Sequence, residues 1–248
     1  MFSMKRITPR RISNFLKYGV SEKGRKRKRA AKQQRREKKF MSGRWQHGDN
    51  DITHRNYTSY DEYLEHQGAK LDKIIERLHK TEQEDYDDFK DRFEHCKSLQ
   101  QARSVLCLGA RIGTEVQALH GLGYFAVGID LNPGAENRYV LPGDFHQIVF
   151  PDASIDAIYT NVMDHVYDIE KILAEVDRLL PAEGLFITDL LQGFDEGFIP
   201  GEYEATHWRT TDGFISKLCA ISGFRVIEDR EIGKRRNNSW RQVVFQKS

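Results

Sequence analysis

Short apolar runs alternate with amphipathic stretches from residue 104 to the end of the chain. Apolar runs of this length predict buried strands, and apolar residues spaced by three and four predict helices. The predicted strands cover 104–108, 126–130, 155–160, 184–190, 224–230 and 241–246, with another around Val140 or at 147–149. The predicted helices cover 113–122, 169–180 and 211–223. This alternation favours parallel pairing through right-handed crossovers. The last two strands are joined by a polar segment too short for a crossover helix, so we expect them to pair antiparallel.

A second pattern precedes the alternating region. Between residues 57 and 98, tyrosine, leucine, isoleucine and phenylalanine recur at helical spacing. Thr58 or Ser59 is placed to cap the first helix, with Glu62 as the capping-box partner. We expect these helices to pack on the domain that follows and to help cover its ligand. The alternative is that they form one side of a coiled coil.

The charge pattern divides the chain further. Residues 1–45 carry 17 Lys and Arg against Glu22 and Glu37, whereas the remainder carries 22 basic and 35 acidic residues. We therefore predict a basic, disordered arm (1–45), a helical extension (46–100) and an α/β domain (101–248). Residues 5–44 are expected to contact a polyanion such as RNA, DNA or an anionic membrane. The alternative is a solvated tail.

Several classes of protein are disfavoured. No run of about 18 apolar residues predicts a transmembrane helix, and no apolar stretch near the N-terminus predicts a secretory signal. The three cysteines, Cys96, Cys107 and Cys219, form no metal-binding pattern, so we predict no metal site. They favour structural roles in a reducing, cytoplasmic compartment.

The candidate chemistry begins where the first strand of the alternating region ends. Gly109 and Gly113 allow a tight turn and a close approach of the backbone to a ligand, and the following helix N-terminus favours an anionic group. Asp130 ends the next strand, where a carboxylate can accept hydrogen bonds from ribose hydroxyls. A dinucleotide site would need a central glycine at Arg111. A nicotinamide dinucleotide, S-adenosylmethionine and a plain structural turn all remain open at this point.

Later segments add a resemblance. The Gly143-Asp144 pair, "IVFPDASIDAI", "MDHVYDIEKILAEVDRLL" and "LLPAEG" follow in the order and spacing found in class I S-adenosylmethionine-dependent methyltransferases. The resemblance covers about residues 104–246. It implies a Rossmann-like, seven-stranded, mostly parallel sheet with an antiparallel last strand.

The resemblance also implies a set of cofactor-binding residues. The loop after the first strand would line the methionine end, Asp130 would hold the ribose, and Asp144 would accept from the adenine amino group. The full set is Gly109, Ala110, Arg111, Gly113, Glu115, Asp130, Leu131, Asp144, Phe145 and Asn161. Two positions depart from the family pattern: Cys107 replaces a frequent acid and Arg111 a frequent glycine. Glu115 is a candidate to replace the lost carboxylate.

Methyl transfer needs a base only when the acceptor must lose a proton. Asp164 and His165 are the main candidates, because they follow the fourth strand at the edge where α/β proteins bind ligands. Asp189 and His207 are further candidates. Tyr203, His207 and Trp208 lie in a long loop on the same side and are predicted to contact the substrate.

The sequence therefore predicts an S-adenosylmethionine-dependent methyltransferase whose acceptor is a glycan, a lipid-linked molecule or another small molecule. One alternative is an RNA methyltransferase that uses the basic arm. Another is an inactive methyltransferase fold that acts as a polyanion-binding adaptor. A nicotinamide-dependent oxidoreductase is disfavoured by the missing central glycine and by the two terminal strands without a crossover helix.

Overall fold

The computed structural model describes residues 45–47, 51–235 and 238–248. Of the predicted basic arm, only Trp45 falls within these ranges, so the expectations for residues 5–44 lie outside the described residues. Among the described residues no helix is long and apolar enough to cross a membrane.

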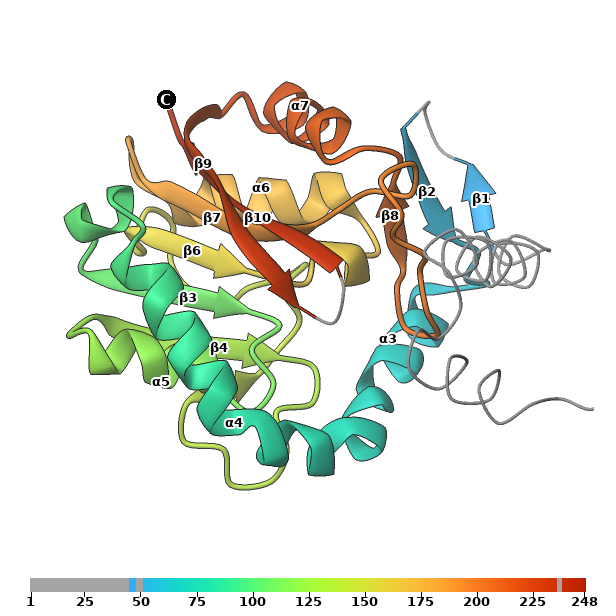
Figure 1. Ribbon diagram of the computed structural model, residues 1–248, viewed down its shortest axis with the longest axis horizontal. Helices are drawn as coiled ribbons and strands as arrows, with labels where there is room; N and C mark the ends of the chain where they lie inside the picture. The colour runs from blue at the N-terminus through green and yellow to red at the C-terminus, as the bar shows by residue number, and fades with distance from the viewer. Residues whose placement is uncertain (1–44, 48–50, 236–237) are drawn as a thin grey trace, which may run out of the picture. The chain divides into compact units, whose positions relative to one another are not determined.

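A seven-stranded sheet forms the centre of the molecule (Figure 1). Its strands, in spatial order, are β5 (Val140–Pro142), β4 (Phe125–Asp130), β3 (Ser104–Leu108), β6 (Ala157–Thr160), β7 (Leu185–Leu191), β10 (Asn238–Gln246) and β9 (Arg225–Arg235). The five strands from β5 to β7 pair in parallel, and β10 runs antiparallel to both β7 and β9. The predicted fold class is confirmed. Of the two positions considered for the short strand, that around Val140 is correct, and 147–149 is not a strand.

Helices cover both faces of the sheet because its central strands are apolar on both sides. On one face, α4 (Lys70–Glu94) and α5 (Thr114–Gly121) pack on Val105, Cys107 and Tyr159. On the other, α6 (Ile169–Leu179) and α7 (Thr211–Ser222) pack on Leu106, Ile158 and Phe186. Neighbouring strand residues thus enter opposite cores, as the two-residue period of a strand requires.

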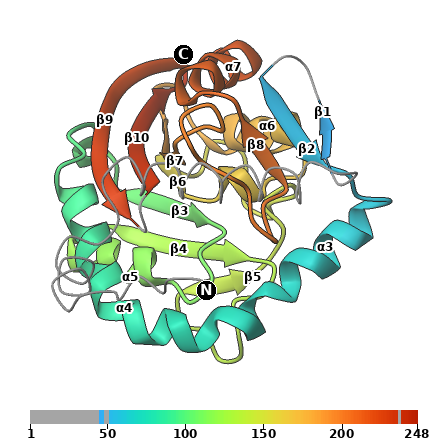
Figure 2. The same cartoon turned by 45° about the vertical axis from the view of Figure 1, so that its right-hand side comes forward.

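The predicted helical extension begins with α3 (Tyr60–Gly68). The Ser59 hydroxyl caps it by accepting from the backbone N–H of Glu62, and the Glu62 carboxylate accepts from the backbone N–H of Thr58. Helix α3 lies beyond the carboxyl ends of β4 and β5, and α4 continues from it along one face of the sheet (Figure 2). The extension therefore packs on the sheet domain, as expected.

A small second sheet was not predicted. It joins β1 (Trp45–His47), β2 (Ile52–Arg55) and β8 (Thr206–Trp208) in antiparallel pairs. Strands of three or four residues contain too little alternation to be recognised, and β2 pairs with a segment about 150 residues away. Two 3₁₀ turns, Ser98–Gln101 and Met163–His165, complete the described elements.

Candidate functional site

The loop between β3 and α5 brings its backbone close to β6. Gly109 has a φ of +73°, and a Cβ built there would lie 2.5 Å from a methyl carbon of Val162. Gly113 has a φ of +82°, and its Cβ would lie 2.7 Å from Tyr139. Both positions require glycine on steric grounds. Arg111 also has a left-handed backbone, with a φ of 46°, a conformation that favours glycine.

The carboxylate of Asp130 fixes this loop. One oxygen accepts from the backbone N–H of Arg111 at 3.0 Å, and the other accepts from the backbone N–H of Asn132 at 2.9 Å. Each carboxylate oxygen has a second lone pair for a further donor. Burial raises the pKa of Asp130, and the two backbone donors oppose that shift.

Two cavities adjoin at the carboxyl edge of the sheet. A small cavity of about 40 Å³ lies against Asp130, and a cleft of about 380 Å³ opens beside it. Leu131 and Phe145 line the small cavity, whereas Ala110, Glu115, Asn161 and Asp164 line the cleft. The residues common to both are Lys70, Gly109, Arg111, Val162 and His165. Most of the predicted cofactor-binding residues therefore gather at one edge.

Asp144 differs from the expectation. Its carboxylate accepts hydrogen bonds from the Tyr60 hydroxyl and from the backbone N–H of His146, and it lines neither of these two cavities. Burial and the neighbouring carboxylate raise the pKa of Tyr60, so the phenol keeps its proton and donates. The group predicted to accept from adenine is thus held by α3 in this conformation.

Glu115 is buried at the first turn of α5 and lines the cleft. Burial raises its pKa to about 8. The position of the frequent family acid is Cys107, which is buried in the core under α5. Glu115 therefore offers its carboxyl group to the predicted methionine end of the cofactor from α5, whereas the family acid would lie on β3.

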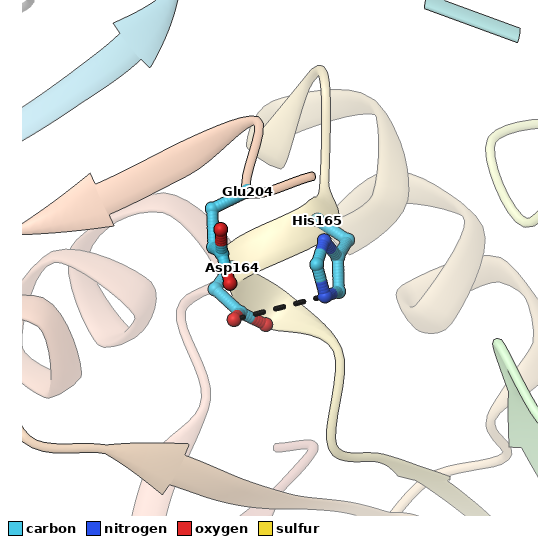
Figure 3. Close-up of side chains that lie close together, drawn as sticks. All are labelled: Asp164, His165 and Glu204. Atoms are coloured by element: carbon cyan, nitrogen blue, oxygen red, sulfur yellow. Dashed lines mark ion pairs between the residues drawn. The ribbon is translucent and has the colours of Figure 1, made fainter. Parts of the chain in front are cut away.

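The side chains of Asp164, His165 and Glu204, which all line the cleft, lie close together (Figure 3). One ligand-type atom from each lies within 4.8 Å of the others. The side-chain nitrogen of Lys70 lies 2.7 Å from Nε2 of the same imidazole. Because this imidazole nitrogen already accepts a hydrogen bond from Lys70, we do not interpret the cluster as a metal site.

The surroundings of His165 argue against its predicted role as the base. Its Nδ1 lies 2.9 Å from the backbone carbonyl of Tyr203, which can only accept, so Nδ1 carries the proton. Its Nε2 then accepts from Lys70. Burial lowers the pKa of His165 well below the usual value, which keeps the ring neutral. Both ring nitrogens are engaged, and the imidazole orients Lys70.

Asp189 is not available as a base. Its side chain lies between the sheet and α4, where it accepts from Arg92 at 2.9 Å, from the Tyr159 hydroxyl at 2.7 Å and from Gln242 at 3.0 Å. The sequence placed Asp189 at the ligand edge because it lies near the end of β7. The side chain faces α4 instead, and it stabilises the fold.

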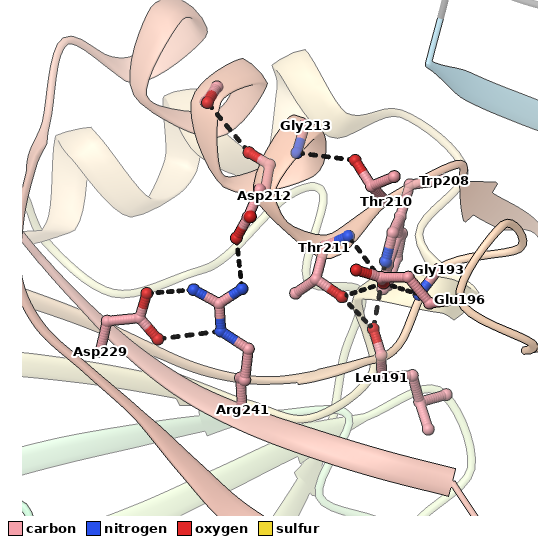
Figure 4. Close-up of polar contacts among 11 residues, drawn as sticks. Leu191, Gly193, Glu196, Trp208, Thr210, Thr211, Asp212, Gly213, Asp229 and Arg241 are labelled. Atoms are coloured by element: carbon pink, nitrogen blue, oxygen red, sulfur yellow. Dashed lines mark hydrogen bonds and ion pairs between the residues drawn. The ribbon is translucent and has the colours of Figure 1, made fainter.

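Two of the three predicted substrate residues lie away from the cleft. Trp208 stacks on Phe214 with ring centroids 4.0 Å apart. Its Nε1 donates to the carbonyl of Leu191 (Figure 4). His207 is buried in the small sheet, where its ring contacts Trp45. Both belong to β8, and pairing with β2 directs this segment into a core. Tyr203 does line the cleft.

The loop after β7 is anchored at the start of α7 (Figure 4). The Glu196 carboxylate accepts from the hydroxyl and backbone N–H of Thr211, and the Arg241 guanidinium pairs with Asp212 and Asp229. These contacts fix the ends of the segment that carries Tyr203 and Glu204 to the cleft.

Sequence reasoning missed the residues that α3 and α4 contribute. Tyr63 donates to the carbonyl of His165, Gln67 donates to the carbonyl of Tyr203, and Lys70 contacts the His165 ring. Tyr63 and Gln67 lie four residues apart on one face of α3, and Lys70 begins the next helix. This spacing was the available signal, but it does not show which groups the two helices pack against.

The residues at the edge fit S-adenosylmethionine. The glycine turn allows a close approach, Asp130 has free lone pairs beside the small cavity, and Glu115 offers a buried carboxylate for an ammonium group. The small cavity holds only a few water molecules. Tyr63, Gln67 and Lys70 from α3 and α4 line this cavity beside Asp130.

Comparisons with known proteins agree with this geometry. The family described as methyltransferase domain matches residues 106–188. No curated protein sequence matches the chain.

Solved structures share the fold at low sequence identity. A Burkholderia thailandensis 1,6-didemethyltoxoflavin-N1-methyltransferase, solved with S-adenosylhomocysteine, aligns with a TM-score of 0.56 at 13% identity, over 83% of this chain and 100% of the other. A possible histamine N-methyltransferase from Thermotoga maritima gives 0.55 at 16%, over 74% and 99%. A putative Haloferax volcanii methyltransferase, solved in complex with the activator Trm112, gives 0.58 at 15%, over 73% and 96%. Residues 106–188 thus match the methyltransferase-domain family, and the described part of the chain has the fold of these methyltransferases.

Proposed function

We propose that this protein transfers the methyl group of S-adenosylmethionine to a small-molecule acceptor, or to the terminal unit of a glycan or lipid-linked molecule, held in the 380 Å³ cleft. The observation that carries the proposal is the meeting of this cleft with the small cavity at Asp130. A methyl donor with its ribose at Asp130 and its methionine near Glu115 would present its methyl group at that junction. The cofactor supplies an electrophilic methyl group there.

The lining of the cleft supports an acceptor of limited size. Ile74, Leu78 and Phe89 of α4 line the cleft together with Phe198 and Trp240. The acidic residues at the cleft are Asp85, Glu115, Asp164, Glu202 and Glu204, and the basic ones are Lys70, Arg77 and Arg111. An excess of carboxylates disfavours a polyphosphate backbone. This lining of carboxylates and apolar side chains suits a neutral or cationic acceptor with one apolar face.

We propose different roles for the two predicted catalytic residues, Asp164 and His165. Asp164 lines the cleft, where burial and the neighbouring Glu204 carboxylate raise its pKa to about 7, whereas His165 positions a neighbouring side chain through its two ring nitrogens. Tyr203 is the substrate-side residue that we retain, because it lines the cleft.

A transfer assay tests the proposal. Purified protein is incubated with methyl-labelled S-adenosylmethionine and separate small-molecule, glycan, lipid, RNA and protein fractions. We expect label in a small-molecule, glycan or lipid fraction. Label in RNA alone would support RNA methylation through the basic arm, a candidate favoured by the 17 Lys and Arg of residues 1–45. No binding of S-adenosylhomocysteine by calorimetry would contradict both and favour an inactive adaptor.

A further inference from the structure

Lys70 lies where the two cavities meet. It is the first residue of α4 and lines both the small cavity and the cleft. Its Nζ lies 2.7 Å from Nε2 of His165 and 5.5 Å from the centre of the Tyr203 ring. A side chain at this point faces the space between a bound methyl donor and its acceptor.

The groups around Lys70 favour a neutral amine. Burial and the facing guanidinium of Arg111 lower its pKa to about 7, although Asp164, Glu204 and Asp130 oppose the shift. The N-terminus of α4, which carries partial positive charge, acts in the same direction as Arg111. The neutral His165 ring accepts a hydrogen bond from either form of the side chain and holds its nitrogen in place.

Elimination leads to the same residue. Five residues line both cavities: Lys70, Gly109, Arg111, Val162 and His165. Glycine and valine have no basic atom, and a guanidinium does not accept a proton in a protein. Both nitrogens of His165 are engaged, as described above. Lys70 alone of the five offers a lone pair at the junction.

We propose that Lys70 is the general base that removes the proton from the acceptor's nucleophilic atom during methyl transfer. This inference rests on the proposed function and deepens it, because it restricts the acceptor to a nucleophile that carries a proton, namely a hydroxyl or an amine. A tertiary amine or a thioether has no proton to lose and would not need Lys70.

The step is balanced. The electron pair of the acceptor atom forms the bond to the methyl carbon, the pair of the breaking carbon–sulfur bond stays on sulfur, and the acceptor's proton passes to Nζ of Lys70. The ammonium that forms is compensated by the carboxylates of Asp164 and Glu204. It returns the proton to water once the products leave.

Competitive labelling tests the state of Lys70 without any acceptor. The full-length protein is pulsed with acetic anhydride between pH 5 and 11, and acetylation is quantified by peptide mass spectrometry. Lys80, an exposed residue on the same helix, is the internal control. We expect Lys70 to react with a midpoint near pH 7. A Lys70 midpoint of about 10, the value of an ordinary lysine amine, would overturn the inference.

Variants test the role in transfer. Using the acceptor fraction that the wild type methylates, we expect Lys70→Met and Lys70→Arg to lower kcat by about 10²- to 10⁴-fold. We expect S-adenosylhomocysteine affinity to stay within about threefold, and the rise of wild-type kcat through pH 7 to be lost. Lys80→Met is expected to match the wild type. Lys70→Arg keeps a positive charge but does not accept a proton. A loss of activity in this variant would therefore show that Lys70 acts by removing a proton and not through its charge.

The outcomes separate the two proposals. Undiminished transfer and an unchanged pH profile in Lys70→Met would overturn this inference while leaving the proposed function intact. No transfer by the wild type to any fraction would overturn the proposed function and this inference with it.

Discussion

Replacing Asp130 by asparagine tests the contact that we propose between Asp130 and the ribose of the cofactor. The carboxylate accepts two backbone N–H groups, from Arg111 at 3.0 Å and Asn132 at 2.9 Å, and has lone pairs left for ribose hydroxyls. Asparagine keeps the shape but replaces one accepting oxygen by an NH₂ donor. One loop N–H then faces a donor, and at least one ribose hydrogen bond is lost.

The magnitude follows from these bonds. A hydrogen bond to a charged group contributes about 1.5–3 kcal/mol, so the Kd for S-adenosylhomocysteine is expected to rise about 10- to 100-fold. The unpaired loop N–H costs about 1–3 kcal/mol of folding stability, or a fall in Tm of about 2–10 °C.

Isothermal titration calorimetry and thermal unfolding measure the two effects. Asp152→Asn is a control, because this exposed carboxylate pairs with Arg178 at the surface, and such pairs contribute little. An Asp130→Asn protein that binds S-adenosylhomocysteine as tightly as the wild type would refute the assignment of Asp130 to the ribose.

Three further predictions follow from other contacts. Arg92→Met leaves the Asp189 carboxylate buried without its ion-pair partner, so chemical denaturation should show a loss of about 3–5 kcal/mol; a loss below about 1 kcal/mol would contradict a structural role. Glu115 holds a proton in the folded protein up to about pH 8 that the unfolded chain releases above its ordinary pKa, so its contribution to stability falls as pH rises between these values. Binding of the ligand ammonium should expel this proton at pH 7, and calorimetry in buffers of different ionisation enthalpy should detect the release in the wild type but not in Glu115→Gln. Tyr60→Phe frees the Asp144 carboxylate for adenine, so S-adenosylhomocysteine should bind about 2- to 10-fold more tightly; weaker binding would show that the hydroxyl contributes to the site.

The central sheet was predictable because its signals are local. Each parallel strand is a short apolar run bounded by a turn. The order of the motifs along the chain identifies the strand that ends at Asp130 as the second strand of the alternating region. The antiparallel end of the sheet followed from the polar link between the last two strands. The small sheet of β1, β2 and β8 was not predictable, because its pairing depends on contacts distant in the sequence.

Side-chain direction was harder to predict than strand position. Asp189 lies on a strand that ends at the ligand edge, but the strand period turns its carboxylate toward Arg92. Asp144 lies where the family pattern places it, yet its carboxylate accepts a hydrogen bond from the Tyr60 hydroxyl. Tyr60 belongs to α3, a helix outside the sheet domain that the resemblance covers. Lys70 was missed for the same reason: its role depends on how α4 packs against His165, which the spacing of residues within the helix does not encode.

The most direct measurement is a crystal structure of the protein with S-adenosylhomocysteine. We expect density along the carboxyl edge of β3 and β4, with both ribose hydroxyls within hydrogen-bond distance of Asp130 and the sulfur near Lys70. Density for the ligand elsewhere, or an Asp130 carboxylate turned away from the ribose, would contradict this expectation.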